Sequence, residues 1–309
     1  MGTASPIKPE YFQLTRSRVS SRHSHGKMLG SGGKGAINTR SVKKVELQLA
    51  GWMKAVHRVL DPNRPVDIDG DACALAVMTK APRAGEVKTR LVPPLTHDEA
   101  AQLNSSFLSD VAAAISAAAT ERIARGVAVY TPLGTEAAYE NILPEEFFLI
   151  AQRGHNFGDR LIFAAEDLFM VGFTSVCLIN SDSPTVPAEN FSQAVELLHL
   201  PGDCIVLGPS DDGGYYLIGL KKLHREIFER IDWSTERVLN QTLQRATEIG
   251  VEVKLLPAGY DVDDRATLER LCSELLGEHT SRDCGIAANT RKFLAEIIMR
   301  EGRGRIWPA

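Results

Sequence analysis

Four basic residues follow the first long apolar run of the chain closely enough to form one phosphate-binding loop. Lys80, Arg83, Lys88 and Arg90 fall within eleven residues, with Gly85 among them. Lysine and arginine donate charge-assisted hydrogen bonds to phosphate oxygens, and a glycine lets the backbone approach a ligand closely. We therefore expect the loop to bind a nucleotide through Lys80, Gly85, Lys88 and Arg90. A solvated basic turn would have the same composition, so composition alone leaves both interpretations open.

Carboxylates in two distant segments could hold a metal ion beside those phosphates. Asp182 follows the apolar run 176–179, and a second acidic segment holds Asp261, Asp263 and Asp264. Mg²⁺ that is bound to nucleotide phosphates takes one or two carboxylates together with phosphate oxygens. Asp264 is suited to cap the helix that follows it, which leaves Asp261 or Asp263 to complete a site with Asp182. Asp182 could instead form a turn before the next proline.

The segment 208–220 combines a turn signal with polar residues that suit a substrate loop. Asp212-Gly213, placed between two apolar runs, predicts a β-hairpin. Gly213 and Gly214 would also let the backbone approach a nucleotide ligand. Asp212 could orient a sugar or an acceptor, or accept a proton from it. The hairpin and the substrate loop can be the same segment, and we count Asp212 and Asp182 as the candidate catalytic residues.

Apolar runs that alternate with helical patterns position these segments. Buried strands are expected at 74–78, 127–130, 147–150, 176–179 and 205–207. Helices are expected at 97–119, 161–169, 189–198, 235–249, 266–275 and 289–300, and Thr96-x-x-Glu99 predicts a capping box at the first of them. This alternation predicts an α/β fold, a mostly parallel open sheet with helices on both faces. Ligands bind such sheets outside the carboxyl ends of the strands.

Charge and composition limit the class of protein. Residues 1–60 hold eleven Lys/Arg and two acids, a net charge of +9, so the remaining 249 residues carry −13. So acidic a core is unsuited to nucleic acid, and no nucleic-acid partner is expected. Five scattered cysteines form no C-x-x-C pair and favour a reducing compartment such as the cytoplasm. No apolar run reaches the roughly 18 residues that a membrane-spanning helix needs.

The composition also divides the chain. Residues 1–60 are predicted to be a disordered basic extension. This extension could be an organelle transit peptide, or the native chain could begin at Met53. Residues 70–280 are predicted to form one transferase domain, and residues 281–309 a helical C-terminal tail.

Six segments, taken in order, resemble a known family. They are KAP with GEVKTRL (80–91), Q with GDR (152–160), NSDSP (180–184), GP with DGGYYLIGL (208–220), WST (233–235) and DVD (261–263). The chain resembles the GT-A-type glycosyltransferases of the arsenosugar-biosynthesis or radical-SAM (selenodomain)-associated transferase family. It is more distantly similar to the 2-phospholactate and molybdenum-cofactor guanylyltransferases.

The resemblance implies a GT-A-like nucleotide-diphospho-sugar transferase fold over about residues 72–276. It implies that Lys80, Lys88 and Arg90 bind the nucleotide and that Asp182 binds Mg²⁺ or Mn²⁺. By analogy with the guanylyltransferases, Asp263 is the second metal ligand. The next residue is an aspartate where the family often has threonine, which leaves open which acid of this segment binds the metal.

Three functions agree with these features. The first is a metal-dependent glycosyltransferase that uses a nucleotide-diphosphate sugar and a small-molecule acceptor. The second is a nucleotidyltransferase that uses a nucleotide triphosphate and releases pyrophosphate. The third is a non-catalytic nucleotide-binding module, which the carboxylates suited to a metal ion disfavour.

Overall fold

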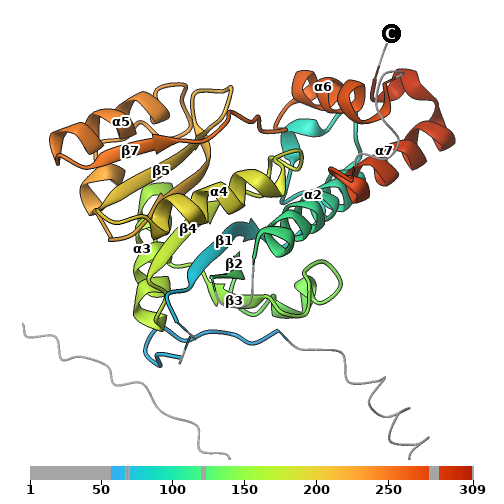
Figure 1. Ribbon diagram of the computed structural model, residues 1–309. Coiled ribbons are helices and arrows are strands. Elements are labelled where there is room, and N and C mark those ends of the chain that lie inside the picture. The colour runs from blue at the N-terminus through green and yellow to red at the C-terminus, as the bar shows by residue number, and fades with distance from the viewer. Residues whose placement is uncertain (1–56, 67, 69, 120–122, 278–284, 308–309) are drawn as a thin grey trace, which may run out of the picture. The chain divides into compact units, whose positions relative to one another are not determined.

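The apolar runs of the sequence assemble into one mixed sheet. The computed structural model describes residues 57–66, 68, 70–119, 123–277 and 285–307 (Figure 1), and the described strands lie in the order β3-β2-β1-β4-β6-β5-β7. Strand β6 runs antiparallel to both of its neighbours, and the other neighbouring strands are parallel. The strands are β1 (Cys73–Lys80), β2 (Ala124–Thr131), β3 (Phe148–Ala151), β4 (Ser175–Ile179), β5 (Cys204–Pro209), β6 (Tyr215–Leu220) and β7 (Glu252–Leu255).

Helices cover both faces of this sheet (Figure 1). One apolar cluster includes α2 (His97–Ala118) and α4 (Ala188–His199), and the other includes α3 (Phe157–Val171) and α5 (Val238–Glu248). Leu75 and Val77 of β1 belong to the first cluster, and Ala74 and Ala76 to the second, because successive side chains of a strand point to opposite faces. A strand that is buried on both faces has a continuous apolar sequence. The predicted α/β fold is confirmed.

The Asp-Gly segment forms the predicted hairpin between β5 and β6. Gly213 has a φ of +85° and its amide donates to the Ser210 carbonyl at 3.1 Å. The amide of Ser210 donates in turn to the Gly214 carbonyl at 3.1 Å. The hairpin places Asp212 at the end of the sheet where β4 and β1 also end.

Two helix starts that the sequence predicts are present. The Glu99 amide donates to Thr96 Oγ1 at 3.2 Å, and the Thr96 amide donates to Glu99 Oε2 at 2.9 Å, which completes the capping box of α2. Helix α6 (Arg265–Leu276) begins after Asp264, whose Oδ1 accepts from the Thr267 amide at 2.8 Å. Capping therefore accounts for Asp264.

The last helix, α7 (Ala288–Glu301), packs in the same unit as the sheet. It shares a third apolar cluster with the first half of α2 and with α6. Asp110 accepts hydrogen bonds from the amides of Asn289 and Thr290, at 2.9 and 2.8 Å, at the start of this helix. The predicted C-terminal tail is thus a packed helix where it is described.

Some expectations for local structure need correction. Helix α5 begins at Val238, three residues later than predicted. Ser234, just before the predicted start, has a φ of +63°, a left-handed conformation that is not found in a right-handed helix. Strand β7 was not predicted, because this short edge strand is half exposed and has no apolar run. Leu60 is buried and its amide donates to the Leu149 carbonyl at 2.7 Å, so the packed core begins before the predicted end of the basic extension. The rest of that extension, through residue 56, lies outside the described residues.

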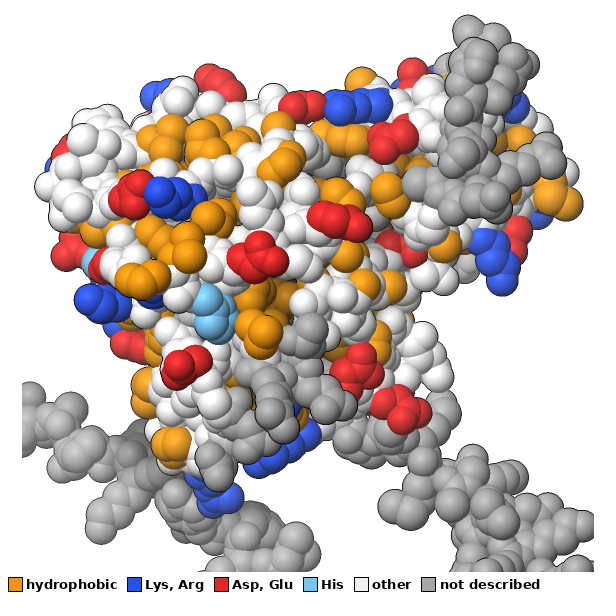
Figure 2. All heavy atoms as spheres, viewed as in Figure 1, with side chains coloured by type: hydrophobic (Ala, Val, Ile, Leu, Met, Phe, Trp, Pro, Cys, Tyr) orange, Lys and Arg blue, Asp and Glu red, His pale blue; other side chains and the backbone are white. Residues whose placement is uncertain are grey.

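Two further observations concern the charges on the surface and the length and polarity of the helices. On the face drawn in Figure 2, acidic and basic side chains lie interspersed among apolar ones. No helix among the described residues is long and apolar enough to cross a membrane.

Candidate functional site

Two adjoining cavities lie at the carboxyl ends of β1 and β4. The first has a volume of about 400 Å³ and the second of about 500 Å³, which is the size range of small-molecule sites. Residues that line both cavities are Met78, Arg90, Phe157, Ser181, Asp182 and Asp263. The cavities therefore meet at the predicted metal carboxylates.

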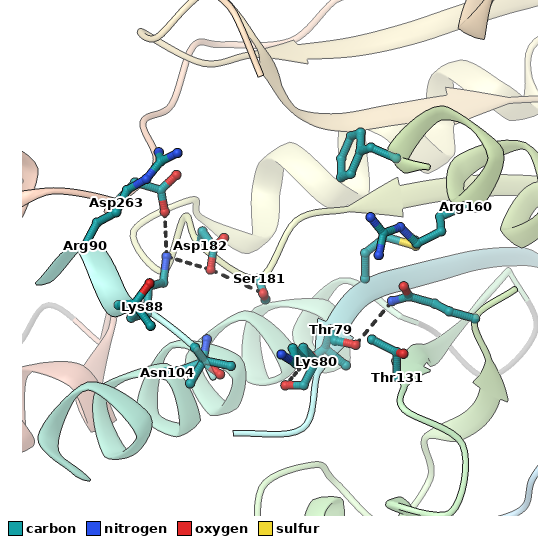
Figure 3. Close-up of a pocket in the computed structure, with 15 residues that line it drawn as sticks. Thr79, Lys80, Lys88, Arg90, Asn104, Thr131, Arg160, Ser181, Asp182 and Asp263 are labelled. Atoms are coloured by element: carbon teal, nitrogen blue, oxygen red, sulfur yellow. Dashed lines mark hydrogen bonds and ion pairs between the residues drawn. The ribbon is translucent and has the colours of Figure 1, made fainter. Parts of the chain in front are cut away.

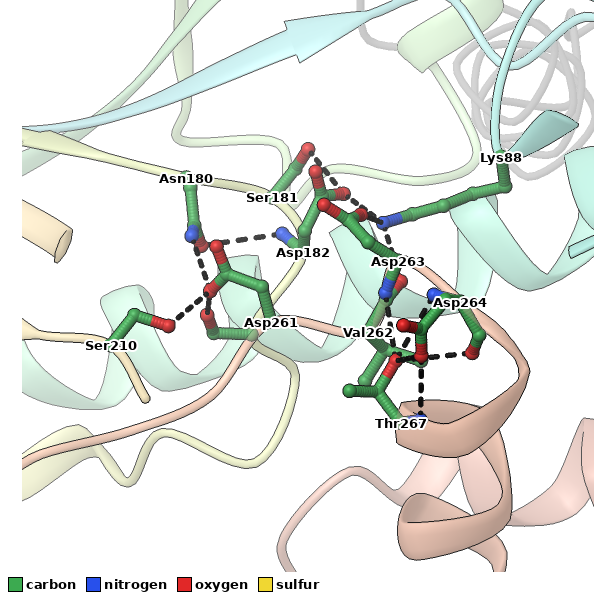
Figure 4. Close-up of polar contacts among 11 residues, drawn as sticks. Lys88, Asn180, Ser181, Asp182, Ser210, Asp261, Val262, Asp263, Asp264 and Thr267 are labelled. Atoms are coloured by element: carbon green, nitrogen blue, oxygen red, sulfur yellow. Dashed lines mark hydrogen bonds and ion pairs between the residues drawn. The ribbon is translucent and has the colours of Figure 1, made fainter. Parts of the chain in front are cut away.

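Lys88 lies between those carboxylates. Its Nζ is 2.8 Å from Asp182 Oδ1 and 2.8 Å from Asp263 Oδ1, and it donates to the Val262 carbonyl at 2.8 Å (Figures 3 and 4). Its side chain is 5% exposed, and its backbone has a φ of +47°, which is uncommon for a residue with a Cβ. Leu91 of the short helix η1 (Thr89–Leu91) is buried and anchors the loop that holds Lys88 in this place.

The charge of Lys88 is secured by its two partners. Burial by itself lowers the pKa of its ammonium, but the charges of Asp182 and Asp263 and their hydrogen bonds outweigh burial, and the pKa is raised. The site thus contains a permanent positive charge enclosed by two carboxylates.

The two carboxylates around Lys88 could also hold a divalent cation whose remaining ligands are phosphate oxygens. Asp182 and Asp263 come from different loops and direct one oxygen each toward a single cation position. Mg²⁺ bound to a nucleotide needs one or two such carboxylates. No group of three or more His, Cys, Asp or Glu side chains in the described part of the chain is arranged to hold a metal ion. A metal ion at the pair would therefore depend on ligand oxygens and would compete with Lys88.

The first cavity contains three further cations. Lys80 pairs with Glu86 at 3.2 Å, and Lys80, Arg90 and Arg160 all line the cavity. Arg160 comes from the first turn of α3 and was not among the predicted site residues. The sequence did contain one signal that could have identified Arg160. The GDR segment (158–160) follows β3, so it lies at the carboxyl end of the sheet, where ligands bind.

Asp261 lines the second cavity and joins three loops through hydrogen bonds. Its Oδ1 accepts hydrogen bonds from Ser183 Oγ at 2.5 Å, Asn180 Nδ2 at 2.8 Å and Ser210 Oγ at 3.2 Å (Figure 4). Asn180 Oδ1 also accepts from the Asp182 amide at 3.3 Å. Asp261 therefore positions the loop that holds Asp182.

The environment of Asp261 opposes its charge. Burial raises the pKa of Asp261 to about 6, although the hydrogen bonds from Ser183 and Asn180 lower it; the charges of Asp182 and Asp212 add to the rise. The sequence left Asp261 as one of two open choices for the metal. Its hydrogen bonds show that Asp261 holds neighbouring loops in place. No local sequence pattern predicts this role, because the donors come from distant segments.

The second cavity joins acidic and aromatic groups. Asp212 lines it, and its Oδ1 accepts from the Gly214 amide at 2.9 Å. Trp233 and Phe157 line the cavity too, with ring centroids 5.1 Å apart in an edge-to-face arrangement. Gly214 borders this cavity and not the first one, so its predicted contact with a nucleotide would be made from the second cavity.

Two predicted site glycines lie outside both linings. Gly85 has a φ of +77° and forms the turn of the basic loop. At Gly213 an added Cβ would be 2.2 Å from the Glu236 carbonyl oxygen, so this glycine permits the close approach of the segment that follows Trp233. In this structure both glycines shape loops that border the cavities.

The comparisons with known proteins agree with this architecture. Residues 113–235 match the family described as "Uncharacterized protein conserved in bacteria (DUF2064)". A comparison with curated proteins gave no match. Among solved structures, the chain is similar to a protein from Desulfovibrio desulfuricans G20 that is provisionally assigned as a nucleotide-diphospho-sugar transferase. The identity is 27% and the TM-score 0.64, over 75% of this chain and 98% of the other. This similarity confirms the fold.

Two solved structures show weaker similarity to the chain. A cytidylyltransferase from Leptospira borgpetersenii is 12% identical over 77% of this chain and 98% of its own, with a TM-score of 0.43. A 4-diphosphocytidyl-2C-methyl-D-erythritol synthase from Anaerococcus prevotii is 13% identical over 64% of this chain and 95% of its own, with a TM-score of 0.42. Similarities of this strength carry no functional argument.

Proposed function

We propose that this protein is a transferase that binds a nucleotide-diphosphate sugar in the first cavity and transfers the sugar to a small acceptor in the second. The observation that carries the proposal is the junction of the two cavities at Asp182 and Asp263, which Lys88 of the first cavity contacts. The cationic cavity suits the diphosphate, and the acidic and aromatic cavity suits hydroxyl groups. The name of the similar Desulfovibrio protein supports the same substrate class.

The residues of the chain take distinct roles in this reaction. Lys80, Lys88 and Arg90 bind the diphosphate and stabilise the charge that grows on it as the sugar leaves. Asp212, in the acceptor cavity, orients an acceptor hydroxyl or accepts its proton.

Asp182 and Asp263 would hold Mg²⁺ or Mn²⁺ together with the phosphate oxygens. When bound, such an ion would neutralise part of the charge on the leaving diphosphate. The competition between Lys88 and a cation for the same two carboxylates links occupancy of this site to nucleotide binding. The finer assignment, to transferases associated with arsenosugar biosynthesis, is part of this proposal.

Nucleotidyl transfer is the second candidate. Four cations line the first cavity, which is enough positive charge for a triphosphate as well as a diphosphate. In that reaction an acceptor oxygen attacks the α-phosphate and pyrophosphate leaves, and the same cations stabilise the leaving group.

The products separate these functions. The protein is incubated with Mn²⁺ and either nucleotide sugars or nucleotide triphosphates, in the presence of hydroxylated acceptors. Release of a nucleoside diphosphate from a nucleotide sugar supports glycosyl transfer, and release of pyrophosphate from a triphosphate supports nucleotidyl transfer. Tight nucleotide binding without turnover of either donor would contradict both and support a binding module.

A further inference from the structure

Two arginines near the start of α3 differ in their partners. Arg153 Nη2 is 2.7 Å from both Asp167 Oδ1 and Glu166 Oε2, so its guanidinium is paired with two carboxylates. Arg160 lines the first cavity, and its Nε is buried without a hydrogen-bond partner among the described residues. Burying a guanidinium N–H without a partner is costly. The Arg160 side chain makes no hydrogen bond or ion pair with another described residue, so the outer nitrogens of its guanidinium are free for a ligand of the cavity.

Gln152 lines the same cavity and offers the opposite kind of group. Its Nε2 donates to the Val129 carbonyl at 2.7 Å and to the Thr79 carbonyl at 3.2 Å. Backbone carbonyls accept only, so these two bonds fix the orientation of the carboxamide and use both of its N–H groups. The group left for a ligand is the acceptor Oε1.

Arg160 and Gln152 line the first cavity at a distance from Lys88 and Asp263. Figure 3 shows Arg160 and Thr131 on the side of the cavity away from Lys88 and Asp263, with Lys80 and Thr79 between the two groups. The bond from Gln152 to Thr79 places Gln152 beside Thr79. Phosphates that extended from Lys88 to Lys80 would leave the base of the nucleotide toward Arg160 and Gln152.

We propose that Arg160 and Gln152 read the base of the bound nucleotide and select guanine or cytosine. The inference rests on the proposed function, since it assumes a nucleotide in the first cavity. The two N–H groups of a guanidinium fork need two adjacent acceptors, and the Gln152 Oε1 needs a donor beside them.

Guanine and cytosine present this pattern, and the other two bases do not. Guanine offers N7 and O6 as adjacent acceptors, with N1–H beside them, and arginine pairs with N7 and O6 in two hydrogen bonds. Cytosine offers O2 and N3 with the N4 amino group beside them. The acceptors of adenine are separated by C–H or amino groups, and the two carbonyls of uracil flank an N–H. A wrong base would leave Arg160 or Gln152 unpaired in the occupied cavity.

A binding panel tests the inference. The dissociation constants of GDP, CDP, ADP and UDP are measured by titration calorimetry for the wild type, Arg160→Lys and Arg64→Ala. Arg64 is the matched control, because its side chain is 87% exposed and pairs with Asp61 at 3.7 Å. We expect the wild type to prefer GDP or CDP over ADP and UDP by about 5- to 150-fold, the range of one bidentate pair. Arg160→Lys, which keeps the charge but loses the fork, should reduce that preference to within about 3-fold, and Arg64→Ala should retain it.

The other outcomes are distinct. Equal binding of all four nucleotides by the wild type, or a preference for ADP or UDP, overturns base reading and leaves the proposed function standing. Equal weakening of all four by Arg160→Lys shows that Arg160 contacts phosphate or ribose and also overturns it. If no nucleotide binds to the wild type, the proposed function fails together with the inference.

Discussion

Lys88 gives the site its electrostatic character. It is a buried ammonium that contacts two carboxylates from separate loops, in a backbone conformation that non-glycine residues rarely adopt. Removing either carboxylate leaves Lys88 with one carboxylate partner and the Val262 carbonyl. In the proposed complex, a cation bound to both carboxylates would release Lys88 toward the phosphates. The same three residues therefore serve the ligand-free protein and the proposed complex.

The predicted role of Asp182 as a metal ligand can be tested with a single substitution. Asp182→Asn removes one of the two oxygens that would hold a metal ion, and we expect it to abolish the metal-dependent part of nucleotide binding. The thermal midpoint should stay within a few degrees of the wild type, because the Asp182 side chain is 33% exposed and Lys88 retains Asp263. Calorimetry with and without Mn²⁺ measures the first effect.

A second carboxylate provides the control for that experiment. Asp203 is 25% exposed and pairs with His224 at 2.9 Å, away from both cavities. Asp203→Asn should leave metal-dependent binding unchanged. Metal-dependent binding by Asp182→Asn at the wild-type level would show that the metal ligands lie elsewhere.

At the scale of residues, the sequence predicts the parts of the site that local patterns mark. Lys88 and Arg90 stand in a cluster of basic residues, and Asp182 follows an apolar run. Asp261 and Arg160 gain their roles from contacts with distant segments. The three donors to Asp261 come from two other loops, which no spacing along the chain reveals.

At the scale of elements, the hairpin between β5 and β6 supports the acceptor cavity through one close contact. A Cβ at Gly213 would meet both a φ of +85° and the Glu236 carbonyl at 2.2 Å. We expect Gly213→Ala to lower the free energy of unfolding by about 2–5 kcal/mol, since backbone strain and overpacking add. Denaturant unfolding measures this change.

Gly250 is a control that separates backbone strain from overpacking. It has a φ of +71° and nothing within 4 Å of an added Cβ. Gly250→Ala should therefore show the strain alone, about 1–2 kcal/mol. Equal losses at both positions would mean that the contact between the hairpin and Glu236 contributes nothing.

Helix α7 is held against α2 by an acid whose charge depends on pH. Glu99 is a buried side chain whose Oε1 lies 2.5 Å from Arg300 Nη2 and 3.0 Å from Arg305 Nη1. Burial raises the pKa of Glu99, but hydrogen bonds from Arg305 and Thr96 outweigh burial and lower it. A lowered carboxyl pKa stabilises the fold above the unfolded value of 4.5, and this contribution is lost as the pH falls through the folded pKa.

We therefore expect Glu99→Gln to reduce the free energy of unfolding by about 1–2 kcal/mol at pH 7. The difference should shrink as the pH falls from 4.5 through the lowered pKa of folded Glu99, where the folded wild type also loses the charge. Denaturant unfolding at pH 7 and at a pH below 4.5 measures the difference between wild type and Glu99→Gln. The exposed Glu196→Gln is the control. A deficit that is the same at both pH values would mean that the loss is one of packing and not of charge.

The sequence predicts the elements whose burial is regular. Strand β1, buried on both faces, has an unbroken apolar run, and α2 has both its capping box and its apolar spacing. The docking of α7 on α2 could not be predicted, because Asp110 and Asn289 are separated by 179 residues. The half-exposed β7 lacks the apolar pattern by which a strand is recognised.

At the scale of the whole molecule, the chain divides into a basic segment and an acidic core. Contacts separate a unit ending at Met53 from the unit Lys54–Ala309. We predict that a chain starting at Met53 has the same thermal midpoint as the full chain, because residues 1–52 lack the apolar periodicity of a packed segment. Differential scanning calorimetry of the two chains checks this. A loss of more than a few degrees would show that the basic segment stabilises the core.

The most direct test of the account is the affinity of a nucleoside diphosphate for variants of the basic loop. We predict that Lys88→Ala and Arg90→Ala each weaken binding at least about 10-fold, or about 1.4 kcal/mol, because each loses a charge-assisted contact to phosphate. Lys221 donates to the Gly202 carbonyl at 2.6 Å and lines neither cavity, so Lys221→Ala should change the affinity by no more than about 2-fold. Equal weakening by all three would indicate diffuse electrostatics, and no weakening by Lys88→Ala or Arg90→Ala would contradict the assignment of this site.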